Sequence, residues 1–346
     1  MKVVGIIMLV IILLLLIAAA VYCYRCTNYW QKDHKKTLAA GIKEKQVVLD
    51  NGSVINYAEG PDNGKALLLI HGQTGSWEDY ERVLPELSEN WHIYAVDCYG
   101  HGQSEHDETK YFMSENGDDL IWFVEHVIGK ETVISGHSSG GLLAAYVAAY
   151  GDKLITGAVL EDPPAFSTEP DYFERSFAYQ DTYKPLHNYL QSAKEEHWET
   201  YYLRHCLWGR LYMKSAMDGL GNYAQKYLDK HPDEPLQFFF MPESINAMFL
   251  SMPDYDFQFG DHFYDYSWHS GITHAEMMAD IRVPTIFLHV EEMYTDDGIL
   301  MAASSNEQAE KAAALIRDCE LITLSGNHDI HRYQPDEFIH AINRMQ

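Results

Sequence analysis

The sequence predicts an α/β fold in which helices cover both faces of a mostly parallel sheet. Two observations support it: apolar runs alternate with helical patterns after the first 45 residues, and one long aromatic-rich stretch interrupts this alternation. Strands that alternate with helices favour parallel pairing, because each helix carries the chain back across the sheet. The chain has 346 residues, of which 47% are hydrophobic and 22% charged, enough for one large domain.

The opening apolar run extends from Val3 to Tyr22 without a charge. Its 20 residues, at a rise of about 1.5 Å each, span about 30 Å as a helix, the thickness of a hydrocarbon core. The run exceeds the usual length of a signal peptide's apolar region and has no clear cleavage site. We therefore expect residues 1–24 to be a retained, single-pass membrane anchor and residues 25–45 a polar tether.

The side of the membrane stays open. More Lys and Arg residues follow the apolar run than precede it, which favours a domain on the cytoplasmic side. A signal anchor with a short basic start would place the domain on the opposite side. The sequence therefore predicts membrane attachment without an orientation.

The main body divides into a core and an insertion. Residues 46–162 and 282–346 are expected to form the core, and residues 163–281, which contain no clear buried strand, a helical cap over the sheet's carboxyl edge. The aromatic residues of this insertion are expected mainly to form the cap's own core, with a minority lining a pocket. The expected strands are Gln46–Leu49, Val54–Ala58, Ala66–Ile70, Trp91–Val96, Thr132–Ser135, Ile155–Leu160, Thr285–His289 and Leu321–Leu324.

Charge and cysteine content exclude some partners. The formal net charge is -26, so the phosphate backbone of a nucleic acid would be repelled. The chain has five cysteines, an odd number without the spacing of a disulfide framework. Cys23 and Cys26 form a CxxC pair at the end of the apolar run, but no second pair accompanies it. We expect neither a zinc nor a redox site there.

The sharpest motif is VISGHSSGG, Val133–Gly141, which contains G-x-S-x-G centred on Ser138. A predicted strand precedes it and a predicted helix follows, the context in which this motif presents a nucleophile. The tight turn would lift the Ser138 hydroxyl clear of the sheet. It would also direct the N–H of Ser139 toward the oxyanion that forms during nucleophilic attack. Ser138 is therefore the predicted nucleophile.

Two further loops supply expected partners of this serine. The strand Ala66–Ile70 runs into His71-Gly72-Gln73, where Gln73 is predicted to give the second oxyanion N–H and His71 to be structural. His328 lies on the loop after the last strand, from which an imidazole can reach over the sheet to the serine. His328 is the predicted general base. His331 is the alternative, although its position suits a packed loop residue better.

These segments resemble motifs of the α/β-hydrolase superfamily. The segments LLLIHGQTGSW, VDCYGHGQS, SGHSSGG and SGNHDIHRYQPDEF occur in the family's order, and the resemblance covers roughly Gln46 to the C-terminus. It implies a mainly parallel sheet of about eight strands, with a cap inserted after the sixth. It also implies hydrolysis through an acyl-enzyme, without a metal or an organic cofactor.

The acid of the expected triad departs from the family pattern. Family members often carry an aspartate shortly after the seventh strand, where this chain has Met293. Asp296 follows closely and is the favoured acid, with Asp297 beside it. Some capped members take the acid from just after the sixth strand, where Glu161 and Asp162 offer that option and Asp162 has the closer offset. One carboxylate is needed to orient the imidazole and to stabilise its charged form.

The expected chemistry is attack of Ser138 on a carbonyl, with a lipophilic carboxylic ester as the expected small-molecule substrate. The aromatic cap and the anchor motivate the lipophilic choice. A different hypothesis is a membrane-anchored binding protein that has lost its acid and its activity. Acyl transfer and carbon–carbon bond hydrolysis also stay open, because the same fold hosts them.

Overall fold

The computed structural model describes residues 2–346 and contains one sheet of eight strands in the order β1-β2-β4-β3-β5-β6-β7-β8. β2 pairs antiparallel with β1 and β4, and the other neighbours are parallel. The predicted α/β-hydrolase fold is confirmed. The strands are β1 (Lys43–Val48), β2 (Val54–Glu59), β3 (Lys65–Ile70), β4 (Trp91–Val96), β5 (Thr132–His137), β6 (Ile155–Glu161), β7 (Thr285–Val290) and β8 (Cys319–Leu324).

The central strands are buried on both faces, as their continuous apolar runs predicted. In β3, Leu68 and Ile70 belong to one hydrophobic core, while Leu67 and Leu69 belong to another on the opposite face. The alternation follows from the two-residue period of a strand. Parallel strands of this kind end at a common edge, and the segments with the predicted site residues all follow such strand ends.

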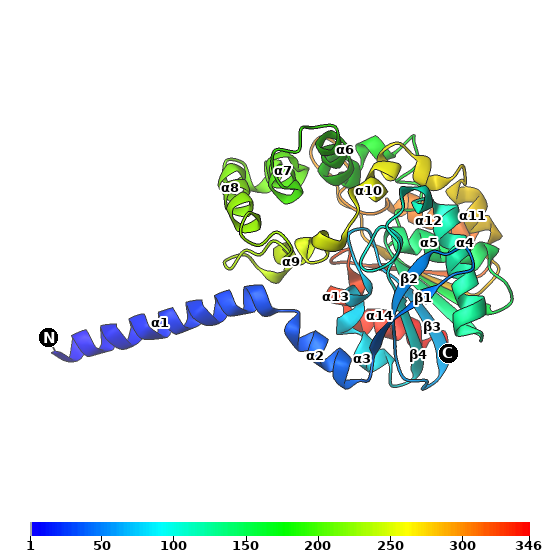
Figure 1. The fold of residues 1–346 in the computed structure, drawn as a ribbon, viewed down its shortest axis with the longest axis horizontal. Coiled ribbons are helices and arrows are strands. Elements are labelled where there is room, and N and C mark those ends of the chain that lie inside the picture. Colours follow the sequence, from blue (N-terminus) through cyan, green and yellow to red (C-terminus); the bar gives the residue numbers. More distant parts are fainter. Residues whose placement is uncertain (1) are drawn as a thin grey trace.

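Helices cover both faces of the sheet (Figure 1). One core packs the sheet against α4 (Met113–Phe123), α5 (Ser139–Tyr150), α11 (His274–Asp280) and α12 (Asn306–Leu315). The other packs it against the short helix η1 (Trp77–Arg82), α3 (Leu84–Leu87), α13 (Ile330–Tyr333) and α14 (Pro335–Asn343).

The insertion is helical, and its helices α6–α9 lie beyond the sheet in Figure 1. Before α11, its α-helices are α6 (Lys184–Leu190), α7 (Trp198–His205), α8 (Ala216–Leu228), α9 (Glu243–Asn246) and α10 (Phe257–Tyr264). The last helix of the expected insertion, α11, packs on α5 and α12, so we place it with the helical layer of the main domain.

The segment after the expected anchor differs from the expected tether. Helix α1 runs from Lys2 to Asn28, and residues 25–45 are not an extended tether. They contain a second helix, α2 (Gln31–Ala39), which packs on η1. Thr37 is buried there and its hydroxyl donates to the carbonyl of Glu81. The polar composition of this segment reflects a helix with one solvated face.

Helix α1 projects from the domain (Figure 1). Its stretch Val3–Asn28 is long and apolar enough to cross a membrane and is not buried within the protein. A helix near an N-terminus with these properties is compatible with a membrane span or with a signal sequence.

Candidate active site

The turn between β5 and α5 holds Ser138 in an unusual backbone conformation. Its φ is 54° and its ψ is -122°, a strained combination for a residue with a side chain. The turn is tight because a Cβ on Gly136 would lie 2.0 Å from the carbonyl oxygen of Gly140. A Cβ on Gly140 would lie 2.2 Å from the carbonyl oxygen of His71. Gly136 is thus required by the tightness of the turn itself, and Gly140 by backbone packing against the loop after β3.

The structure brings His328 to Asp162. Nδ1 of His328 lies 2.6 Å from Oδ2 of Asp162, whose other oxygen accepts the backbone N–H of Val290 at 3.0 Å. Asp162 directly follows β6 and has a positive φ of 41°, which turns its side chain toward the loop after β8. The His328 ring also lies 4.4 Å from the ring of His137, the residue before Ser138.

The favoured acid, Asp296, has a different environment. Asp296 and Asp297 are both exposed, on a turn where the Gly298 N–H donates to the Thr295 carbonyl. Within residues 2–346, no hydrogen bond or ion pair joins either carboxylate to His328. The prediction of Asp296 as the partner of His328 is therefore corrected to Asp162. The strand-to-loop turn at Asp162 aims its carboxylate inward, whereas the turn after β7 closes at the surface.

The contacts in this pair stabilise opposite charges. Burial alone would raise the pKa of Asp162, but the hydrogen bonds from His289 and His328 outweigh it and lower the pKa to about 2. Burial would likewise lower the pKa of His328, but the hydrogen bond to Asp162 and its charge raise the pKa to about 9. The imidazole is 39% exposed, so its Nε2 edge stays accessible. Ser138 and His328 are not hydrogen-bonded to each other in residues 2–346; such contacts often form only with substrate.

A second carboxylate–histidine pair supports the same loop. The buried carboxylate of Glu161, one residue before Asp162, accepts the N–H of His331 at 2.7 Å and contacts its Nδ1 at 2.8 Å. His331 is itself buried. The alternative base is therefore a packed loop residue, and two consecutive carboxylates of β6 hold the segment that carries His328.

The loop after β3 places the predicted oxyanion donors beside the elbow. A Cβ on Gly72 would lie 3.1 Å from the Cβ of Ser138, so Gln73 directly follows a residue that packs against the elbow. In residues 2–346, the backbone N–H of Gln73 donates to no other group. The N–H of Ser139 opens helix α5, where no intrahelical acceptor is available. Both N–H groups are free to bind a ligand oxygen.

The cap holds the side chain of Gln73. Its Nε2 donates to the hydroxyl of Tyr255 at 2.7 Å, and its Oε1 accepts from the hydroxyl of Tyr183. Both tyrosines are buried in the insertion. His101 also fixes this loop, since its Nε2 accepts the N–H of Thr74 at 3.1 Å. Sequence reasoning missed the two tyrosines, and no local pattern distinguishes them from the other aromatic residues of the cap.

His71 has the structural environment that we expected. Its Nε2 accepts the N–H of Cys98 at 2.9 Å, and its Nδ1 donates to the carbonyl of Gly72 at 2.6 Å. The imidazole thus joins the loop after β3 to the loop after β4 and is buried between them.

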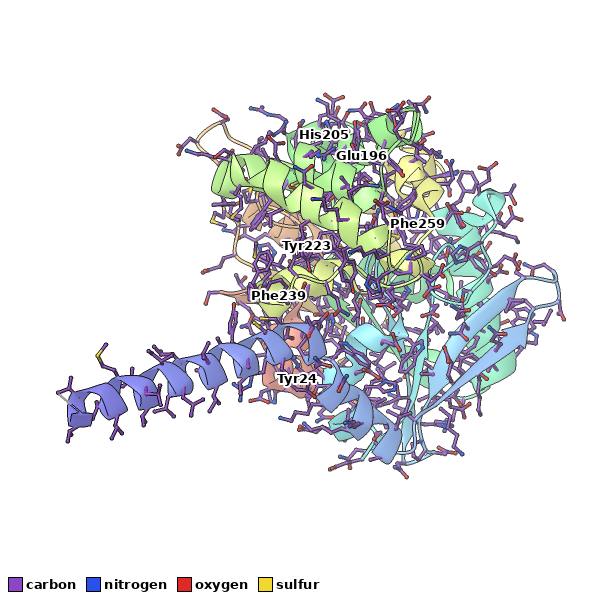
Figure 2. The ribbon with its side chains drawn as sticks, turned by 60° about the vertical axis from the view of Figure 1, so that its left-hand side comes forward. Tyr24, Glu196, His205, Tyr223, Phe239 and Phe259 are labelled. Carbon is purple, nitrogen blue, oxygen red and sulfur yellow. The ribbon has the colours of Figure 1, made fainter. Side chains whose placement is uncertain are left out.

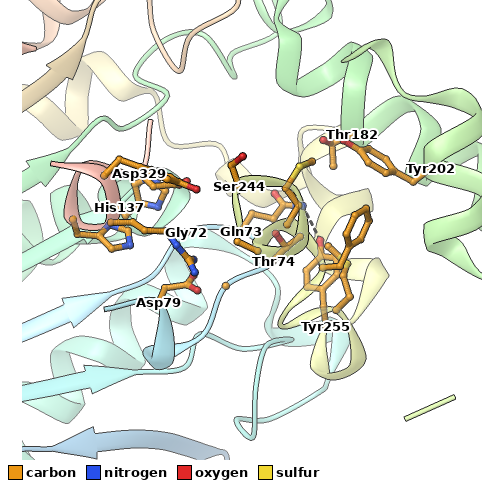
Figure 3. Close-up of a pocket in the computed structure, with 18 of the residues that line it drawn as sticks. Gly72, Gln73, Thr74, Asp79, His137, Thr182, Tyr202, Ser244, Tyr255 and Asp329 are labelled. Atoms are coloured by element: carbon orange, nitrogen blue, oxygen red, sulfur yellow. Dashed lines mark hydrogen bonds and ion pairs between the residues drawn. The ribbon is translucent and has the colours of Figure 1, made fainter. Parts of the chain in front are cut away.

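A cavity of about 200 Å³ lies between this loop and the cap (Figure 3). Gly72 and His137, the neighbours of Ser138, form part of its inner wall. The core side also contributes charged groups: Asp79, Asp329 and Arg332. The cap side is mainly apolar and aromatic, with Leu186, Trp198, Tyr202, Phe249, Met252 and Tyr255. The cavity thus has one polar wall and one apolar wall.

Comparisons with known proteins agree with this fold. A serine hydrolase-like protein of Danio rerio is 28% identical over 132 residues, which cover 38% of this chain and 40% of that protein. The chain thus matches less than half the length of that relative. A solved membrane phospholipase A has a TM-score of 0.62 at 18% identity, covering 99% of this chain and 97% of that one.

An esterase of Exiguobacterium antarcticum has a TM-score of 0.60 at 15% identity and covers 87% of this chain and 98% of its own. At such identities the two solved structures show a common fold. The family profile described as "Alpha/beta hydrolase family" matches residues 67–341, from β3 to α14 and through the whole insertion. The chain is a member of the alpha/beta hydrolase family.

Proposed function

We propose that this protein is a membrane-anchored serine hydrolase that cleaves a lipophilic carboxylic ester through an acyl-enzyme. The observation that carries the proposal is the 2.6 Å contact between Asp162 and His328, on a loop beside the strained Ser138 turn. Asp162 orients the imidazole and stabilises its charged form. A binding protein that had lost its acid would lack this contact, so the contact favours the enzyme.

In the proposed reaction, His328 accepts the proton of Ser138 as the serine oxygen attacks the ester carbonyl. The N–H groups of Gln73 and Ser139 bind the resulting oxyanion, and each such donor contributes about 3 kcal/mol in comparable sites. His328 then protonates the leaving alcohol, and the tetrahedral intermediate collapses to an acyl-enzyme on Ser138. Water, deprotonated by His328, releases the acid and regenerates the serine.

The two walls of the cavity support an amphiphilic ester. The apolar cap wall suits an acyl chain, whereas the core wall with Asp79, Asp329 and Arg332 suits a polar leaving group. A lysolipid or a monoacylglycerol has this combination. Helix α1 supports the same choice, because a membrane anchor would keep the cavity near lipid substrates.

A serine-directed fluorophosphonate probe tests the catalytic part of the proposal. The folded protein should be labelled, and Ser138→Ala should abolish the labelling, while Ser139→Ala should still be labelled. Unlabelled, folded wild-type protein would favour the binding-protein hypothesis.

The substrate class needs a separate assay. A series of p-nitrophenyl esters should give kcat/KM values that rise from short to long acyl chains. Activity on short esters alone would contradict the proposal of a lipophilic substrate, but not the proposal that the protein is a serine hydrolase.

A further inference from the structure

Two adjacent phenylalanines of the cap are exposed where the anchor meets the domain. In the segment between α8 and α9, Phe239 is 51% exposed and Phe240 38%, although Phe238 is fully buried. The ring of Tyr223 on α8 lies 6.4 Å from that of Phe239 and 5.8 Å from that of Phe240. Packing from behind thus holds both rings at the surface. Adjacent exposed aromatic rings of this kind mark a contact surface.

The anchor fixes the position of this segment. The hydroxyl of Tyr22, on α1, donates to the carbonyl of Phe240 at 3.3 Å, and the buried amide of Asn246 on α9 donates to the carbonyl of Cys26 at 2.9 Å. Figure 2 shows Phe239 beside the domain end of α1, close to Tyr24. The cap segment is therefore attached to the last turns of the apolar helix.

The depth of these residues follows from the length of α1. Twenty apolar residues, Val3–Tyr22, span the hydrocarbon core at about 1.5 Å each, which leaves Tyr22 and Tyr24 at the level of the lipid headgroups. Tyrosine favours this level because its ring is apolar and its hydroxyl polar. The bond between Tyr22 and Phe240 then places the exposed phenylalanines at the same level.

The charge beside the patch fits a lipid surface. The chain has a net charge of -26, yet the segment that follows α1's apolar part is basic and exposed at Arg25, Lys32, Lys35 and Lys36. Three of these residues line an open pocket at the junction of α1, α2 and the cap, together with Arg82. Arg82 is already paired with Asp33 and Glu243, whereas neither Arg25 nor Lys32 forms an ion pair in residues 2–346. Cations next to a membrane helix attract anionic headgroups.

We propose that Tyr22, Tyr24, Phe239 and Phe240 form a membrane-contact patch that rests the cap on the bilayer, with the adjacent cations on anionic headgroups. This inference rests on the proposed membrane anchor. Helix α9 begins at Glu243, shortly after Phe240, and its residue Ser244 lines the cavity beside the predicted nucleophile. The bilayer contact thus lies next to the wall of the active-site cavity, and the lipid ester enters from the bilayer side of the cap.

Tryptophan quenching tests the depth of the patch. Phe239→Trp is reconstituted as the full chain in phosphatidylcholine–phosphatidylglycerol vesicles, with either ordinary or brominated acyl chains. The matched control is Tyr294→Trp, because Tyr294 is 50% exposed and lies on the loop after β7, away from α1. Brominated lipid should quench the emission added by Phe239→Trp at least twofold and leave that added by Tyr294→Trp unchanged.

Vesicle flotation separates the two proposals. A chain that floats with vesicles after alkaline carbonate treatment, but whose Phe239→Trp emission is not quenched, overturns the membrane-contact patch and leaves the anchor intact. A chain that does not float overturns the anchor and this inference together.

Activity gives an independent readout. Phe239→Ser with Phe240→Ser should lower the hydrolysis of a long-chain ester held in vesicles several-fold, and leave kcat/KM for a soluble short ester unchanged. Lys32→Gln with Lys36→Gln should remove any rate gain that phosphatidylglycerol gives over phosphatidylcholine alone. Equal rates of wild type and the phenylalanine double variant on the vesicle-held ester would refute the proposed entry from the bilayer side.

Discussion

Replacing Asp162 by asparagine tests the proposed triad most directly. In the native protein, one oxygen of Asp162 accepts the Val290 N–H and the other faces Nδ1 of His328. In the Asp162→Asn variant, the amide oxygen should keep accepting the Val290 N–H. The flipped amide would point its NH₂ group at that N–H and leave a buried donor unpaired, which costs about 1–3 kcal/mol. The amide NH₂ then faces Nδ1, so His328 carries its proton on Nε2 and cannot accept one from Ser138.

The expected loss follows from this wrong tautomer. An aspartate-to-asparagine change with the same effect in a serine protease lowers kcat about 10⁴-fold, which corresponds to about 5.4 kcal/mol of activation free energy. The assay is steady-state hydrolysis of a long-chain p-nitrophenyl ester, with fluorophosphonate labelling as a second readout. The matched control is Asp296→Asn, which should keep kcat within about twofold because that carboxylate is exposed and contacts no site residue.

Stability is measured alongside, since the carboxylate also supports the fold. The pKa of Asp162 is about 2 instead of 3.8, a difference worth about 2 kcal/mol at 1.36 kcal/mol per pH unit. This contribution is present above pH 4 and is lost as the pH falls through 2, so Asp162→Asn should lower the Tm at neutral pH. Full activity of a folded Asp162→Asn, together with loss of activity in Asp296→Asn, would refute the assignment.

Three further predictions follow from the same site. Tyr255→Phe removes the acceptor of the Gln73 amide and should lower kcat about fivefold, because the lost hydrogen bond is worth about 1 kcal/mol. An unchanged kcat would show that this cap contact does not position the oxyanion loop. Gly140→Ala places a Cβ 2.2 Å from a backbone carbonyl oxygen and should abolish fluorophosphonate labelling. The control is Gly219→Ala on α8, where a Cβ would meet nothing within 4 Å. This control should raise the free energy of unfolding by about 0.5–1 kcal/mol. His328 must be neutral to act as a base, so its pKa of about 9 predicts that kcat/KM keeps increasing as the pH rises from 6.5 toward 9. The contribution of His328 to stability is full below pH 6.5 and is lost as the pH rises through 9. A value of kcat/KM that levels off by pH 6 would contradict this.

Local sequence was sufficient for the sheet and for the turn that holds Ser138. Each central strand appears as a continuous apolar run because both of its faces are buried, and the structure has those strands within a few residues of the expected ranges. The elbow around Ser138 was equally predictable, because a strand, a G-x-S-x-G turn and a helix occur within one short segment.

The N-terminal segment shows the opposite case. Residues 25–45 are polar, and a tether was the natural interpretation, but α2 buries Thr37 against η1. Amphipathic helices and polar linkers have similar compositions, so only the packing partner distinguishes them. The packing of α11 on α5 and α12 was not predictable for a related reason, since helical periodicity does not say which layer a helix joins.

The sequence by itself determined the fold, the strand–turn–helix around Ser138 and the place of His328 on the loop after the last strand, because each depends on residues close together along the chain. Only the tertiary structure decided which carboxylate faces His328. Asp162, Asp296 and Asp297 all follow strands that end at the same sheet edge, and their distances from His328 depend on how each turn leaves its strand. The cap tyrosines on Gln73 and the aromatic patch beside α1 were likewise decided by contacts between segments far apart in sequence, which no local pattern encodes.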